Sequence, residues 1–126
     1  MENKMVINNR DELVVLDLSK IAFICAEGNY SRIVTMNKRE MTMTIGISKL
    51  ETTIKENALK PVNYVRISRS LIVNHRFLSK IDLVKQVLSL SDGNNVITIK
   101  ASKQNLKKYK TATSQAIPKI KKDKEK

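Results

Sequence analysis

Hydrophobic and polar residues alternate along much of this chain in a way that predicts short β-strands. Ile21, Phe23 and Cys25 occupy every second position between residues 20 and 26, which places them on one face of a strand. Ile24 and two alanines fill the other face, so we expect this strand to be buried on both sides. Similar patterns predict strands at residues 5–8, 13–18, 31–36, 40–45, 64–67, 79–84, 86–91 and 96–100.

One internal helix is predicted between residues 48 and 58. Ser48 and Glu51 have the spacing of a capping box, in which the serine caps the helix and the glutamate reaches back to it. Glu51 and Lys55 are spaced to form an ion pair along the helix, and Pro61 ends it. The hydrophobic positions at helical spacing are Leu50, Ile54 and Ala58.

A second helix is predicted to begin at Ser102. Its inward face carries Leu106 and Tyr109. The lysines expected on its outward face are Lys103, Lys107 and Lys110.

These elements predict a mostly β fold with short antiparallel strands, one internal helix and a C-terminal helix. The length of 126 residues suits a single domain. We expect that domain to span residues 1–116 and a basic, flexible tail to occupy residues 117–126.

The charge is strongly basic, with a formal net value of +12. Residues 100–126 hold ten lysines and two acids, a net charge of +8, whereas residues 1–99 hold 14 basic and ten acidic residues, a net charge of +4. This excess favours a polyanionic partner such as nucleic acid or an anionic membrane surface. A basic end is also often a solvated, disordered segment, so charge alone does not identify the partner.

The sequence is poor in the residues that catalysis and metal binding require. It has one histidine, His75, and one cysteine, Cys25, with no cluster of metal ligands and no glycine-rich phosphate loop. Cys25 is interpreted as inert core. We therefore predict a protein that is not an enzyme and has no cofactor. No apolar run is long enough to cross a membrane and no signal peptide is evident, so we expect a cytoplasmic protein without membrane insertion.

Three segments in fixed order carry a resemblance to a known family. Their sequences are IAFICAEGNYSR at residues 21–32, YVRISRSLIVN at residues 64–74 and IKASKQNLKK at residues 99–108. They resemble the LytTR family of bacterial DNA-binding domains, whose signature has the form F-x-R-h-H-R-S-x-h-V-N at the second segment. The resemblance covers about residues 12–113. The family commonly has histidine at the position of Ser68, so we expect a different preferred DNA sequence if that histidine reads bases or holds the loop.

The resemblance implies an elongated stack of small sheets and a function in transcription regulation. It also implies that loops between strands, rather than a recognition helix, enter successive major grooves of duplex DNA. The target would be two half-sites arranged as a repeat, with room for a second copy of the protein. Only about 11 residues precede the match, so we expect no phosphoacceptor domain in this chain and control by abundance, dimerisation or a separate partner. A fragment of a longer regulator would have the same sequence.

The candidate DNA-binding residues lie in the three resembling segments. Arginine suits guanine, amides suit adenine, and lysine, serine and helix N-termini suit phosphate. The candidates are Asn29, Ser31, Arg32, Arg66, Arg69, Ser70, Ser102, Lys103, Gln104 and Lys107. Arg69 is the strongest of them, although a surface ion pair would be the ordinary role of such a residue.

Several residues in these segments also have structural interpretations. Asn29 can serve only to make a turn, and Tyr30 is expected to pack. Arg66 can either contact phosphate or support its loop, whereas Asn74 is expected to be structural. Ser102 can simply cap the last helix.

Two alternatives from other functional classes remain open at this point. A basic β module can associate with RNA or the ribosome, although RNA readers usually stack bases on exposed aromatic side chains. A non-catalytic module for acidic protein surfaces or lipid would bind duplex DNA weakly and without sequence preference.

Overall fold

The computed structural model describes residues 3–116, so the tail expected at residues 117–126 lies outside the described residues. In chain order the elements are β1 (Lys4–Asn8), β2 (Leu13–Asp17), β3 (Ile21–Glu27), β4 (Tyr30–Thr35), β5 (Glu40–Met43), α1 (Ile47–Asn57), β6 (Tyr64–Ser68), β7 (Leu71–Asn74), the short 3-10 helix η1 (His75–Phe77), β8 (Leu78–Asp82), β9 (Val87–Ser91), β10 (Val96–Lys100) and α2 (Lys103–Ala116).

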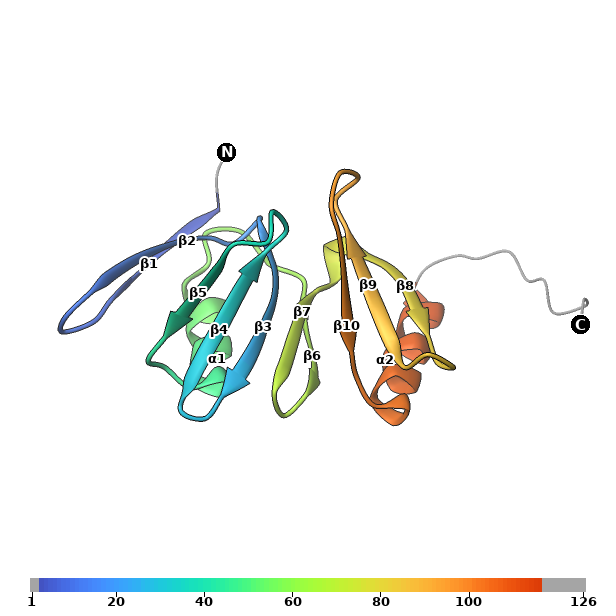
Figure 1. Cartoon of the computed structure of the whole chain (residues 1–126). Coiled ribbons are helices and arrows are strands. Elements are labelled where there is room, and N and C mark those ends of the chain that lie inside the picture. Colours follow the sequence, from blue (N-terminus) through green and yellow to red (C-terminus); the bar gives the residue numbers. More distant parts are fainter. Residues whose placement is uncertain (1–2, 117–126) are drawn as a thin grey trace, which may run out of the picture.

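The strands form three antiparallel sheets that follow one another along the molecule (Figure 1). A two-stranded sheet pairs β1 with β2, a five-stranded sheet has the order β5-β4-β3-β7-β6, and a three-stranded sheet has the order β10-β9-β8. The predicted fold class is therefore confirmed. Strand β5 ends at Met43 rather than residue 45 because the carbonyl of Ile45 accepts a hydrogen bond from the Ser31 hydroxyl instead.

Strand β3 lies in the middle of the five-stranded sheet and is buried on both faces, as the sequence predicts. Ile21 and Ile24 belong to a hydrophobic core shared with α1 and the β1–β2 sheet. Ala22 and Phe23 belong to a second core shared with the β8–β10 sheet and α2. An irregularity in the β3–β4 pairing between Ile21 and Phe23 allows two consecutive residues to face the second core.

Helix α1 begins one residue earlier than predicted and lacks the expected capping box. Gly46 is its N-cap, and no side chain caps it. The prediction that Ser48 caps the helix and Glu51 reaches back to it is therefore wrong. The hydroxyl of Ser48 and the carboxylate of Glu51 instead accept hydrogen bonds from Arg66 on β6. The ion pair between Glu51 and Lys55 is present, at 3.5 Å.

Helix α2 agrees with its prediction. The backbone N–H of Asn105 donates to the Ser102 hydroxyl at 3.1 Å, so Ser102 caps the helix. Leu106 and Tyr109 are buried, whereas the three predicted outward lysines are exposed. No helix within residues 3–116 has both the length and the apolar character needed to cross a membrane.

Candidate nucleic-acid interface

Three bends lie at the same end of the molecule, the lower end in Figure 1. They are the β3–β4 turn, the β6–β7 turn and the junction between β10 and α2. The backbone N–H of Ala26 donates to the carbonyl of Ser70 at 2.9 Å and joins the first two bends. A groove of about 470 Å³, called here the interface groove, is lined by residues from all three segments, among them Arg32, Ser68, Ser70, Lys100, Ser102 and Asn105.

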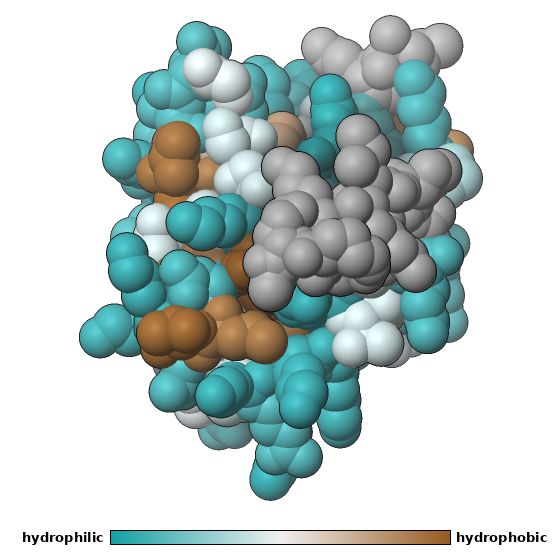
Figure 2. Space-filling model, turned by 90° about the vertical axis from the view of Figure 1, so that its right-hand side faces the viewer, coloured by the Kyte–Doolittle hydropathy of each residue, from teal (hydrophilic) through white to brown (hydrophobic). Residues whose placement is uncertain are grey.

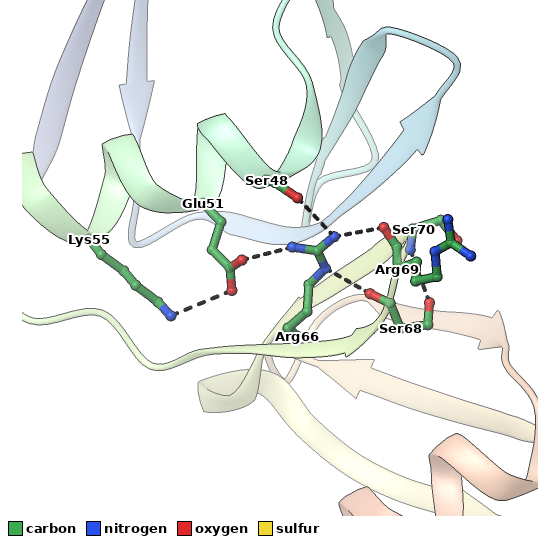
Figure 3. Close-up of polar contacts among 7 residues, drawn as sticks. All are labelled: Ser48, Glu51, Lys55, Arg66, Ser68, Arg69 and Ser70. Atoms are coloured by element: carbon green, nitrogen blue, oxygen red, sulfur yellow. Dashed lines mark hydrogen bonds and ion pairs between the residues drawn. The ribbon is translucent and has the colours of Figure 1, made fainter.

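The β6–β7 bend carries Arg69 at its tip. Its side chain is exposed and forms no hydrogen bond or ion pair with any residue of the described chain. Figure 3 shows its guanidinium directed away from the neighbouring polar cluster. Ser70 is also exposed, and its backbone N–H donates to the Ser68 hydroxyl at 3.2 Å. The bend therefore presents a free cation and a hydroxyl on an ordered backbone.

Arg66 supports this bend from within. Its Nε donates to the carbonyl of Ser68 and its Nη2 to the carbonyl of Arg69, each at 2.7 Å (Figure 3). Its Nη1 donates to Glu51 at 2.7 Å. All three nitrogens of the guanidinium are engaged, so the geometry favours the supporting role that the sequence left open over contact with phosphate.

The β3–β4 bend differs from its prediction at two residues. Gly28 has φ +63°, a left-handed conformation that glycine adopts without strain. Asn29 is exposed, and Tyr30 is also exposed, with 47% of its surface accessible, so the expectation that Tyr30 packs is wrong. Ser31 is fully buried and its hydroxyl donates to the carbonyl of Ile45 at 2.6 Å. Ser31 is therefore not accessible to a ligand, because it faces the same core as Ile33.

Arg32 lies at the interface groove but is already paired with acids. Its Nε is 2.8 Å from Glu27 and its Nη1 is 3.3 Å from Glu40. The guanidinium also lies 5.9 Å from the centre of the Phe23 ring. Cys25 is the partner of Arg32 across the β3–β4 ladder and is only half-buried, so it lines the groove rather than the core alone. Burial raises the pKa of its thiol.

The third bend presents the N-terminus of α2. Ser102, Lys103, Gln104 and Lys107 are all exposed, and the first turn of the helix contains no acidic residue. Free backbone N–H groups and a positive helix end attract anions at such a position. Lys100, which the sequence analysis did not select, is exposed beside the groove at the end of β10. Figure 2 shows the molecule from the right-hand side of Figure 1, and its lower edge in that view is hydrophilic.

Asn74 is structural, as expected. It is 4% exposed, its Nδ2 donates to the carbonyl of Ile21 at 2.9 Å, and its Oδ1 accepts from the backbone N–H of Arg76 at 3.2 Å. These bonds fix the end of β7 against the start of β3. Asn74 therefore holds the scaffold beneath the bends and does not reach the surface.

An elongated β scaffold that gathers cationic, amide and hydroxyl side chains at three adjoining bends has the character of a DNA-binding domain. A sequence model of the LytTr DNA-binding domain matches residues 11–113, and the chain belongs to this family. Membership indicates DNA binding in transcription regulation.

Comparison with solved structures agrees with this fold. The chain is similar to the LytTr DNA-binding domain of a Bacillus cereus protein described as a methyl-accepting/DNA response regulator, with a TM-score of 0.58 and 16% sequence identity. The match covers 90% of this chain and 99% of the other. A search of curated proteins found no match.

Proposed function

We propose that this protein binds duplex DNA in a sequence-specific manner, with its three bends entering major grooves at a repeated half-site. The observation that carries the proposal is the convergence of the bends around one groove, with the unpaired side chain of Arg69 between two residues that line it, Ser68 and Ser70. A second copy of the protein would occupy the second half-site.

The residues divide by chemistry into base readers and phosphate contacts. The forked guanidinium of Arg69 suits the O6 and N7 acceptors of guanine, and the amides of Gln104 and Asn29 suit adenine. We propose phosphate contacts at Ser70, Ser102, Lys103 and Lys107, and we add Lys100 and the hydroxyl of Tyr30 because both residues are exposed. Ser31 and Arg66 are left out, because one is buried and the other is fully engaged.

Duplex DNA is favoured over single-stranded RNA because few aromatic side chains are exposed for bases to stack on. The hydroxyl of Tyr64 donates to the carbonyl of Leu18 at 2.6 Å, and that of Tyr109 is 2.7 Å from Nδ1 of His75. Phe23 is 9% exposed. Tyr30 is then the one strongly exposed aromatic residue of the described chain, which gives no platform on which successive bases could stack.

The test is selection from random duplex DNA at physiological salt. We expect a repeated motif whose halves lie about 10–10.5 base pairs apart, one turn of the double helix. The Arg69→Ala variant should lose the preference at particular bases, at a cost of about 1–3 kcal/mol in binding free energy. The matched control is Arg39→Ala, because Arg39 is an exposed arginine in the β4–β5 turn at the opposite end of the scaffold (Figure 1).

Two results would contradict the proposal. Selection that yields no motif would leave only non-specific DNA binding. An Arg69→Ala variant that selects the same motif as the wild type would remove Arg69 from the base-reading residues.

A further inference from the structure

Arg32, which the sequence predicts to contact DNA, is already paired with two acids of the protein. Glu27 is the last residue of β3, and Glu40 is the first residue of β5. Acidic side chains from two strands therefore form ion pairs with the guanidinium of Arg32 on β4. The side chains of Glu27 and Glu40 are 51% and 57% exposed, whereas that of Arg32 is 29% exposed. The more accessible charges around the Arg32 guanidinium are therefore negative.

The sum of charges in this cluster is −1, because two carboxylates surround one guanidinium. A DNA phosphate that approaches Arg32 must displace a carboxylate or lie beside two of them, and like charges at short range repel. Non-specific binding depends almost wholly on neutralised phosphates. Arg32 therefore adds little to non-specific binding while the two acids hold it.

The edge of a base can form hydrogen bonds with the same cluster. Guanine offers two acceptors to an arginine, and the amino group of cytosine donates to a glutamate. A neutral base edge also avoids the repulsion that a phosphate experiences. The cluster can thus engage a G·C pair without first losing its own ion pairs.

We infer that Glu27 and Glu40 make Arg32 a base reader and keep it from acting as a phosphate contact. This inference rests on the proposed function and assigns a role in specificity to two acidic residues in a protein of net charge +12. The pair discriminates against non-specific DNA, so its removal should raise the affinity for non-specific DNA and lower the ratio of specific to non-specific affinity.

The test compares Glu27→Gln/Glu40→Gln with wild-type protein on the selected motif and on a scrambled duplex at several salt concentrations. The variant should bind the scrambled duplex about three- to tenfold more tightly, and its specificity ratio should fall by a similar factor. Its salt slope on scrambled DNA should steepen by about 0.9, because Arg32 becomes free to neutralise one phosphate.

The control variant is Glu12→Gln/Glu56→Gln, which raises the net charge equally. Both residues are exposed, and neither forms an ion pair with any residue of the described chain, whereas Glu27 and Glu40 both pair with Arg32. Arg32→Ala gives an independent measurement. If Arg32 reads a base, the variant should lose preference at one position of the motif and keep the wild-type salt slope. If Arg32 contacts phosphate, the variant should keep the motif and show a flatter salt slope.

The inference is overturned if the Glu27→Gln/Glu40→Gln variant keeps the wild-type specificity ratio, or if the control variant lowers that ratio to the same extent. An Arg32→Ala variant that keeps the motif and flattens the salt slope also overturns it. Failure of this inference can be distinguished from failure of the proposed function, because in the second case the wild-type protein itself would select no motif.

Discussion

Nη1 of Arg66 lies 2.7 Å from Oε1 of Glu51, and this ion pair joins helix α1 to the bend that carries Arg69. Both side chains are largely buried, with exposed fractions of 26% and 18%. The same guanidinium holds the carbonyls on both sides of the bend tip. The direction in which Arg69 points is thereby coupled to a helix on another part of the scaffold.

The Arg66→Lys substitution tests this coupling. Lysine keeps the positive charge but cannot hold two carbonyls and a carboxylate in one plane. We expect a loss of about 1–3 kcal/mol in the free energy of unfolding and a weakened sequence motif, with an unchanged salt slope. Denaturant unfolding and selection measure these effects. If Arg66 contacted phosphate instead, lysine would preserve both the motif and the affinity.

The Ser102 position separates capping from phosphate binding. Ser102→Ala removes the acceptor for the Asn105 N–H and should lower the free energy of unfolding by about 1 kcal/mol. Ser102→Asp restores the cap and should retain wild-type stability, but its charge repels a phosphate at the helix N-terminus. We therefore expect Ser102→Asp to weaken binding to all duplexes, as titrations would show. Equal binding by Ser102→Asp and wild-type protein would remove this helix end from the interface.

Asn74 gives a prediction about stability alone. The Asn74→Ala substitution removes the side-chain partner of the buried carbonyl of Ile21 and of the part-buried N–H of Arg76. An unsatisfied buried group costs about 1–3 kcal/mol, so the midpoint of denaturant unfolding should fall clearly. Asn94→Ala, at an exposed turn position, is the matched control and should be nearly neutral. Equal midpoints for the two variants would contradict a structural role for Asn74.

The sequence predicts most of the fold because alternation and helical spacing are local signals. The burial of β3 on both faces follows directly from residues 20–26. The capping box at Ser48 does not form because the side chains of Ser48 and Glu51 accept hydrogen bonds from Arg66 instead. Arg66 is 18 residues from Ser48 in the chain. A local pattern carries no information about such a partner.

The candidate site shows the same division between local and long-range information. The sequence identifies its three segments but does not show which of their side chains are accessible. Ser31 is buried because it alternates with Ile33 on the core face of β4, a signal that the pattern did contain. The ion pair between Arg32 and Glu40 depends on the register between β4 and β5. That register places Glu40 opposite Val34, which is two residues from Arg32 and on the same face of the sheet. Only the assembled sheet reveals that contact.

Cys25 offers a probe of where DNA lies. Its thiol is half-buried at the interface groove, and burial raises its pKa above the ordinary value of 9.0. The thiolate is the reactive form, so alkylation should be slow at neutral pH and should rise about tenfold per pH unit until the pH reaches the pKa. At fixed pH, a duplex carrying the selected motif should slow alkylation further by covering the groove, whereas protein unfolded in urea should react faster and show no protection. Mass spectrometry of the alkylated protein measures these rates, and an identical rate with and without the motif duplex would place the DNA away from this groove.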